Sequence, residues 1–122
     1  MRDVTGVLLI VDAANVVGSV PDGWWRDRRG ATERLRDRLA ARDEGEEIVL
    51  VVEGAARGVG SVPGVRVDPA PGSGDDRIVE LAAAAAREDR GCVVVTADRA
   101  LRERVRAYGA QCRGPRAVRP AD

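Results

Sequence analysis

The sequence predicts an α/β fold in which helices cover both faces of a mostly parallel sheet of four to five strands. Three continuous apolar runs indicate strands buried on both faces, as is typical of parallel sheets; they cover residues 7–11, 48–52 and 92–95. Helical patterns separate these runs, and strands that alternate with helices are joined by right-handed crossovers. The length of 122 residues, 44% of them hydrophobic, is that of one ordinary domain.

Together with weaker patterns, these runs predict the order of elements along the chain. This order is strand, helix, strand, loop, strand, helix, strand, helix and strand. Apolar residues recur every three or four positions in the expected helices, which cover residues 31–42, 76–89 and 98–108. The remaining expected strands cover residues 65–67 and 110–112, and the expected long loops cover residues 13–30 and 54–64. Gly91 and Gly109 follow expected helix ends, where a left-handed cap is common.

The predicted domain covers residues 1–112, and residues 113–122 form an Arg- and Pro-rich tail that we expect to be flexible. No apolar run reaches the roughly 18 residues of a membrane span, and the N-terminus lacks the layout of a signal peptide. We therefore expect a cytoplasmic protein with no membrane contact. Cys92 and Cys112 match no zinc-binding spacing and are expected to be small buried side chains in a reducing compartment.

Two missing residue types restrict the chemistry. The chain has no His and no Lys, so its 20 basic residues are all Arg, and 20 acidic residues balance them. This composition excludes Ser-His-Asp triads, Cys-His pairs, Schiff-base lysines and P-loop NTPases, whose phosphate-binding loop needs its Lys. Any catalysis must therefore use carboxylates, hydroxyls, amides, Arg, a thiol or a bound metal ion.

Acidic side chains follow the ends of four expected strands, and an amide accompanies the first. These residues are Asp12 with Asn15, Glu53, Asp75 with Asp76, and Asp98. Because ligands of parallel α/β sheets bind outside the carboxyl ends of the strands, we expect these side chains to meet at one edge. Carboxylates that lie close together repel unless a cation compensates them. Oxygen ligands of this kind suit Mg²⁺ or Mn²⁺.

A divalent cation at this edge would lower the pKa of a bound water and offset the charge that develops on a phosphodiester. The residue set therefore favours metal-dependent phosphodiester hydrolysis. Structural roles remain alternatives for single residues. Asp98 and one residue of the Asp75–Asp76 pair are placed to cap helices, and Glu53 is placed to be an exposed strand-end residue.

Three of these stretches also resemble the motifs of NYN domains, which belong to the PIN-like ribonuclease superfamily. Residues 11–18, VDAANVVG, are similar to the opening motif of that family, and residues 74–80, GDDRIVE, resemble its paired-aspartate helix start. Residues 95–99, VTADR, resemble its third acidic motif. Order and spacing agree from residue 7 to residue 112, and the chain looks most similar to the YacP-like branch.

The resemblance implies a PIN-like three-layer α/β/α sandwich and metal-dependent, endonucleolytic cleavage of RNA. The metal ion would lie among Asp12, Asp76 and Asp98. Asn15 would orient a ligand or the phosphate, and Asp75 is placed to take over the role of Asp76.

Three more residues are candidates for the same site. Glu53 is a candidate metal ligand, at a strand end whose residue type varies within the superfamily. Ser73 and Thr96 are expected to contact the substrate. Association with the ribosome is implied by the resemblance alone, and a homodimer is compatible with the sequence.

Basic residues are concentrated in two stretches that flank an acidic centre. Residues 26–42 hold seven Arg and three acidic residues, and residues 99–122 hold seven Arg and two. Arg binds phosphate in a bidentate manner, so RNA is the expected partner. The candidate phosphate contacts are Arg26, Arg28, Arg29 and Arg57. The alternative is solvated helix faces with ion pairs to acids such as Glu33 and Asp37.

Trp24 and Trp25 follow the first acidic motif and are two of only three aromatic residues. Adjacent tryptophans in a loop offer a stacking platform for unpaired bases, so the expected ligand is single-stranded or looped RNA. We expect one of the two to stack on a base and the other to fill the core beneath the loop.

The competing hypothesis is a catalytically inactive PIN-like module that binds RNA or a protein partner, which zero net charge and small size allow. A receiver-like phosphoacceptor domain is disfavoured because it needs a Lys near the last strand. A dinucleotide site is disfavoured because residues 72–74 do not form G-x-G-x-x-G. The leading hypothesis is a metal-dependent endoribonuclease.

Overall fold

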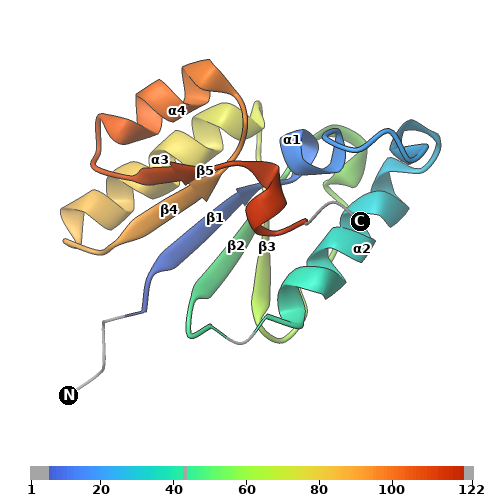
Figure 1. The fold of residues 1–122 in the computed structure, drawn as a ribbon, viewed down its shortest axis with the longest axis horizontal. Helices are drawn as coiled ribbons and strands as arrows, with labels where there is room; N and C mark the ends of the chain where they lie inside the picture. The colour runs from blue at the N-terminus through green and yellow to red at the C-terminus, as the bar shows by residue number, and fades with distance from the viewer. Residues whose placement is uncertain (1–5, 43, 120–122) are drawn as a thin grey trace.

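The protein is built around one five-stranded sheet. The structure is a computed structural model that describes residues 6–42 and 44–119. All neighbouring strands are parallel, in the order β3-β2-β1-β4-β5 (Figure 1). The strands are β1 (Leu8–Asp12), β2 (Glu47–Val52), β3 (Val65–Pro69), β4 (Cys92–Val95) and β5 (Gln111–Arg113). The predicted α/β class and parallel sheet are confirmed.

Helices form one layer on each face of the sheet, which gives the expected three-layer sandwich (Figure 1). On one face lie α1 (Ala13–Val17) and α2 (Arg28–Ala40); on the other lie α3 (Gly74–Arg87) and α4 (Arg99–Arg106). Within the described residues, the 3-10 turns η1 (Trp24–Arg26) and η2 (Gly54–Ala56) lie in connections between these elements, and η3 (Pro115–Ala117) follows β5.

The core is divided in two by the alternation of side chains along the strands. Leu9 and Val11 of β1 pack with α1 and α2, whereas Leu8 and Ile10 pack with α3 and α4. Because helices cover both faces, each central strand is apolar throughout, and this is why the continuous apolar runs predict the sheet. Parallel pairing also brings the carboxyl ends of all five strands to one edge, where α1, α3 and α4 begin.

Side-chain caps set the start of the helices. Asp27 accepts a hydrogen bond from the Gly30 N–H over 2.9 Å, so α2 begins three residues before the predicted position. The expected long loop at residues 13–30 contains α1 and η1. A helix of five residues is too short to show apolar periodicity, so sequence patterning does not detect α1.

One of the two expected left-handed caps is present. Gly109 has a φ of 83°, as predicted. After α3 the left-handed residue is Asp89, with a φ of 54°, rather than Gly91. The chain closes this helix end through a 2.9 Å hydrogen bond from the Arg90 N–H to the Ala85 carbonyl.

The C-terminal stretch differs from the expected flexible tail. Arg113 belongs to β5, and Val118 is 3% exposed within the core beside α1 and α2. The Arg119 guanidinium donates to the carbonyls of Val16 and Val17 at the end of α1. The packed domain therefore extends past residue 112 to residue 119, while residues 120–122 lie outside the described residues. Contacts with the other end of the chain hold this stretch, and no local pattern reveals them.

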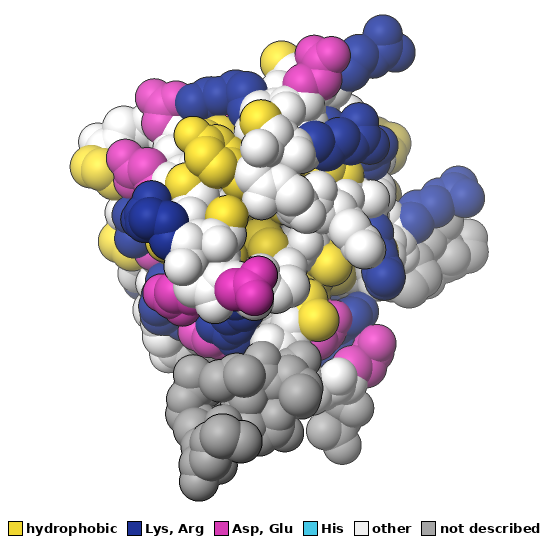
Figure 2. All heavy atoms as spheres, turned by 90° about the vertical axis from the view of Figure 1, so that its left-hand side faces the viewer, with side chains coloured by type: hydrophobic (Ala, Val, Ile, Leu, Met, Phe, Trp, Pro, Cys, Tyr) yellow, Lys and Arg dark blue, Asp and Glu magenta, His cyan; other side chains and the backbone are white. Residues whose placement is uncertain are grey.

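The helices, the cysteines and the surface charges agree with the composition of the chain. None of the helices in the described part of the chain is long and apolar enough to cross a membrane. Cys92 is buried, Cys112 is half-buried, and both are free thiols. On the face in Figure 2, basic and acidic side chains are interspersed rather than separated into blocks.

Candidate functional site

The sheet has a topological switch point between β1 and β4. The chain builds outward from β1 through β2 and β3, then crosses to the other side of β1 to form β4 and β5. Ligands of open α/β sheets bind outside the carboxyl ends of the strands at such a point. Asp12 is the last residue of β1 and Thr96 directly follows β4, so the first and last acidic motifs meet there.

Asp12 is held at the switch point by two hydrogen bonds. Thr96 Oγ1 donates to Asp12 Oδ2 over 2.9 Å. The Asn15 N–H donates to Asp12 Oδ1 over 3.4 Å, which makes Asp12 the N-cap of α1. Asp12 is only 5% exposed. Each carboxylate oxygen therefore has a donor, and folding alone fixes the position of this side chain.

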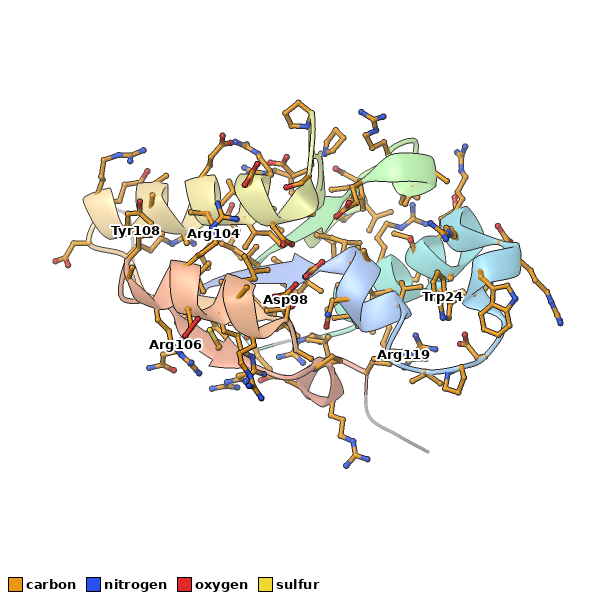
Figure 3. The ribbon with its side chains drawn as sticks, turned by 90° about the horizontal axis from the view of Figure 1, so that it is seen from above. Trp24, Asp98, Arg104, Arg106, Tyr108 and Arg119 are labelled. Atoms are coloured by element: carbon orange, nitrogen blue, oxygen red, sulfur yellow. The ribbon has the colours of Figure 1, made fainter. Side chains whose placement is uncertain are left out.

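Thr96 links Asp12 to Asp98. Its hydroxyl donates to Asp12 and accepts a hydrogen bond from the Asp98 N–H over 3.1 Å. Thr96 is fully buried, so it positions the two aspartates and does not reach a substrate, contrary to the expectation from sequence. Asp98 Oδ1 accepts from the Leu101 N–H over 3.0 Å and caps α4, as its alternative structural role predicts (Figure 3).

Two more contacts fix the loop after β4. Asn15 Oδ1 accepts a hydrogen bond from the Ala97 N–H over 2.8 Å, so this amide ties α1 to the loop. Arg102 Nε donates to the Thr96 carbonyl over 2.8 Å. Sequence reasoning missed Arg102, because its partner is a backbone carbonyl and an Arg on a helix surface looks like any other solvated residue.

Glu53 connects the end of β2 to the start of α3. Its Oε1 accepts a hydrogen bond from the Gly74 N–H over 3.1 Å. A Cβ at position 74 would lie 2.4 Å from the same oxygen, so any larger residue there would displace the Glu53 carboxylate from this contact. Ser73 caps α3 by accepting from the Asp76 N–H over 3.1 Å, and its expected substrate contact stays a prediction.

The two aspartates at the start of α3 have different surroundings. The Asp76 side chain is 70% exposed and forms an ion pair with Arg104 of α4 at 3.0 Å. Figure 3 shows Arg104 on α4, on the side toward α3. Asp75 is half-buried, has no ion pair within the described residues and senses the charges of Asp98 and Glu53. The structure therefore favours Asp75 over Asp76 as the member of the acidic edge.

Burial and like charge raise the pKa of two carboxyls at this edge. Burial, together with the charges of Asp75 and Glu53, raises the pKa of Asp12 from 3.8 to about 6, although its two hydrogen bonds oppose the rise. The pKa of Asp75 is raised by burial first, and then by the charges of Asp98 and Glu53. Four carboxyls from four strand ends therefore act on one another, and we call Asp12, Glu53, Asp75 and Asp98 the acidic edge.

The donor chemistry of the acidic edge fits a hard divalent cation, because its oxygen ligands repel one another in the absence of one. Across residues 6–42 and 44–119, no three acidic or cysteine side chains lie close enough together to enclose an ion. Mg²⁺ usually binds through one or two carboxylates, several waters and substrate phosphate. A site of this open kind is compatible with the spacing of the acidic edge.

The two tryptophans have the different environments that the sequence predicts. Trp24 is partly buried against the core, whereas Trp25 is 51% exposed. Their rings meet edge to face at 5.9 Å. The Arg28 guanidinium lies 5.2 Å from the centre of the Trp24 ring, and that of Arg26 lies 5.8 Å from the Trp25 ring. Both guanidinium groups are held by cation–π contacts.

The remaining basic candidates differ in whether they are free to bind phosphate or are engaged in ion pairs on a helix face. Arg29 forms an ion pair with Glu33 at 3.6 Å, which is the helix-face role of the alternative. Arg57 is exposed directly after η2 and forms no ion pair with any described residue. Arg57, Arg26 and Arg28 are therefore the candidates that remain available to a phosphate.

Comparison with solved structures finds the same fold in Rae1 (YacP) from Bacillus subtilis. A mutant form of that protein matches with a TM-score of 0.77 and 22% sequence identity, covering 92% of this chain and 72% of that chain. A second structure of Rae1 gives a TM-score of 0.76, 21% identity, and coverage of 92% and 73%. No family model matches the sequence. A search of curated proteins also gave no match. The expected likeness to the YacP-like branch is confirmed at the level of the fold.

Proposed function

We propose that the protein is a cytoplasmic, metal-dependent endoribonuclease that hydrolyses phosphodiester bonds of single-stranded or looped RNA. The observation that carries this proposal is that Asp12 and Asp98 share Thr96 at the switch point of the sheet, with Glu53 and Asp75 near enough for their charges to raise the pKa of Asp12. The fold of Rae1 (YacP), found in this chain over 92% of its length, supports a nuclease-type fold.

The acidic edge would hold Mg²⁺ or Mn²⁺, with water and substrate phosphate as the remaining ligands. When bound, such a cation supplies charge neutralisation and a water of lowered pKa. The chain itself supplies position. Thr96 and the Asn15 N–H orient the Asp12 carboxylate, and the Asn15 side chain fixes the loop that leads to Asp98. Folding alone therefore orients the Asp12 carboxylate and the loop that leads to Asp98.

Substrate binding is assigned to the basic and aromatic side chains beside the acidic edge. Arg26, Arg28 and Arg57 offer guanidinium groups for phosphate oxygens. Trp25 is the exposed aromatic residue of this region and offers a face for an unpaired base.

The test is cleavage of a labelled single-stranded RNA by purified protein with Mg²⁺, Mn²⁺ or a chelator. Asp12→Asn and Asp98→Asn are each expected to abolish metal-dependent cleavage while the fold is retained by circular dichroism. Asp37→Asn is the matched control, because Asp37 is an exposed acid on α2 and is expected to leave the rate unchanged. Unchanged cleavage in both Asp12→Asn and Asp98→Asn contradicts the proposal.

One observation favours a second candidate function, a non-catalytic module that binds RNA. The described residues contain no three acidic side chains that enclose an ion. Calorimetric titration with Mn²⁺ separates the two candidates. Absence of metal binding together with retained RNA binding supports the module, whereas metal binding that Asp12→Asn removes supports the nuclease.

A further inference from the structure

A pocket opens directly beside the acidic edge. It has a volume of about 180 Å³ and lies where α1, η1, α2 and η2 converge. Ala13, Ala14 and Val17 of α1 form one wall, and Trp24 forms another. Glu53, a member of the acidic edge, also lines the pocket. The pocket and the candidate metal site therefore share a residue and a sheet edge.

The walls of the pocket suit a flat, unpaired ring. Its lining is mostly apolar, and Trp24 contributes an aromatic side chain. Polar groups are few: the Thr32 hydroxyl is already bonded to the Arg28 carbonyl at 2.8 Å, and Glu53 Oε1 to the Gly74 N–H at 3.1 Å. Glu53 Oε2 and the Arg28 guanidinium are the remaining polar side-chain groups of the lining. A nucleobase has this same combination of apolar faces and a polar edge.

The size of the pocket restricts what enters it. Sites for drug-sized ligands usually have volumes of about 300–1000 Å³, so this pocket accommodates one ring system rather than a complete nucleotide. Ala13 and Ala14 follow Asp12 directly in the chain. A base in the pocket therefore leaves its sugar and phosphate outside, next to the acidic edge.

We propose that this pocket binds one unpaired nucleobase of the RNA strand and so sets the position of the strand relative to the acidic edge. The inference rests on the proposed function, since it assigns the pocket to the same substrate. It separates the two tryptophans by role: Trp24 lines the base pocket, and the exposed Trp25 lies outside it.

Binding is measured with the full chain in a chelating buffer, so that cleavage does not interfere. Trp24 lines the pocket, so quenching of the tryptophan fluorescence of the unaltered chain reports binding there. The probes are the hexamers rA6 and rU6 and the four nucleoside 5′-monophosphates. Saturable quenching by at least one hexamer is expected. Ala14→Leu, at an exposed position of α1, fills the mouth of the pocket without disturbing the core.

Ala14→Leu is expected to weaken hexamer binding roughly 5- to 150-fold, the range that corresponds to the loss of one base–aromatic contact. Ala55→Leu is the matched control, because Ala55 is exposed in η2 and does not line the pocket. Equal affinity of Ala14→Leu and Ala55→Leu, or no quenching by any probe, overturns the pocket assignment. Quenching that Ala14→Leu removes, in a protein that does not cleave RNA, supports the pocket and rejects only the nuclease.

Discussion

The two halves of the acidic edge are built differently. Asp12, at the switch point, is buried and receives a hydrogen bond on each carboxylate oxygen. At the start of α3, Asp75 is half-buried, and Asp76 lies in solvent with Arg104 as its partner. The Asp12 half is therefore fixed by the core of the protein, whereas the α3 half is set by a helix start that solvent and an arginine can reach.

This difference indicates that the two halves of the acidic edge have different roles. The ionised form of a buried carboxylate with a raised pKa has an energetic cost that a bound cation would offset, so Asp12 is the fixed ligand of the proposed metal site. The exposed half is able to adjust to water and phosphate. Substitutions in each half of the acidic edge are expected to differ in their effects.

The largest effect is expected at α3, where Asp75 and Asp76 are adjacent in sequence but differ in surroundings. Asp75→Asn removes a member of the acidic edge and is expected to lower metal-dependent cleavage by more than about 100-fold, since loss of outer-shell partners alone costs about 10- to 100-fold. Asp76→Asn, which removes only the partner of Arg104, is expected to retain cleavage within about threefold. Rates measured under single-turnover conditions check this order, and the reverse order would assign the site to Asp76.

The second prediction concerns the folding free energy that the ionised Asp12 carboxylate costs when no metal ion is bound. Its pKa in the folded protein, about 6, exceeds the ordinary value of 3.8, so the folded state binds the proton more tightly than the unfolded state. Its contribution to stability is therefore full below pH 4 and is lost as the pH rises through about 6. The loss amounts to about 3 kcal/mol.

Asp12→Asn lacks this titration. The unfolding free energy of the variant, minus that of the parent protein, is expected to rise by up to about 3 kcal/mol between pH 4 and pH 7. Denaturant unfolding in a chelating buffer measures this difference, in which the titrations of carboxyls remote from Asp12 cancel. Asp37→Asn, at an exposed acid, is the control. If the unfolding free energies of Asp12→Asn and the parent protein changed in parallel with pH, the pKa of Asp12 would not be raised by folding.

The third prediction tests whether Thr96 positions Asp12 and Asp98. Thr96→Val removes the donor to Asp12 and the acceptor of the Asp98 N–H in a fully buried location. A loss of about 1–3 kcal/mol in unfolding free energy is expected, with a decrease in cleavage of about 10- to 100-fold.

Ser61→Ala is the comparison for Thr96→Val. Ser61 Oγ accepts a hydrogen bond from the Val67 N–H over 2.8 Å, so this variant also loses one hydrogen bond, but on β3 and outside the acidic edge. It is expected to lower stability and leave cleavage unchanged. Equal cleavage by Thr96→Val and Ser61→Ala would show that the hydroxyl of Thr96 serves folding alone.

The smallest effect is expected at the exposed ion pair of α3 and α4. Arg104→Ala removes the partner of Asp76, and both side chains are largely exposed, so the change in unfolding free energy is expected to stay below about 1 kcal/mol. Denaturant unfolding at low and moderate salt checks it. A decrease of several kcal/mol in unfolding free energy would show that the Asp76–Arg104 ion pair stabilises the fold as strongly as a buried contact does.

The sequence predicts the sheet and most of the acidic edge for the same physical reason. Strands buried on both faces are apolar throughout, so their ends are visible as the points where Asp12, Glu53 and Asp98 interrupt apolar runs. Parallel topology then brings those ends together. Other features depend on contacts that no local pattern contains.

The choice between Asp75 and Asp76 is one such feature. Both residues lie in the first turn of α3, and only the position of Arg104 on a neighbouring helix distinguishes them. The roles of Thr96 and Arg102 likewise depend on partners from other elements, and the order of residues 113–119 depends on packing against α1. The pocket beside Glu53 needs four elements to form and has no sequence signature.

We propose that carboxylates from separate strand ends jointly recruit a divalent cation. A crystal grown with Mn²⁺ would reveal such an ion through its anomalous signal. The expected result is a peak bordered by Asp12 and at least one other carboxylate of the acidic edge, with water completing the coordination, and no such peak in crystals of Asp12→Asn. A fully occupied peak elsewhere, or a structure at high Mn²⁺ in which these carboxylates border no ion, would contradict it.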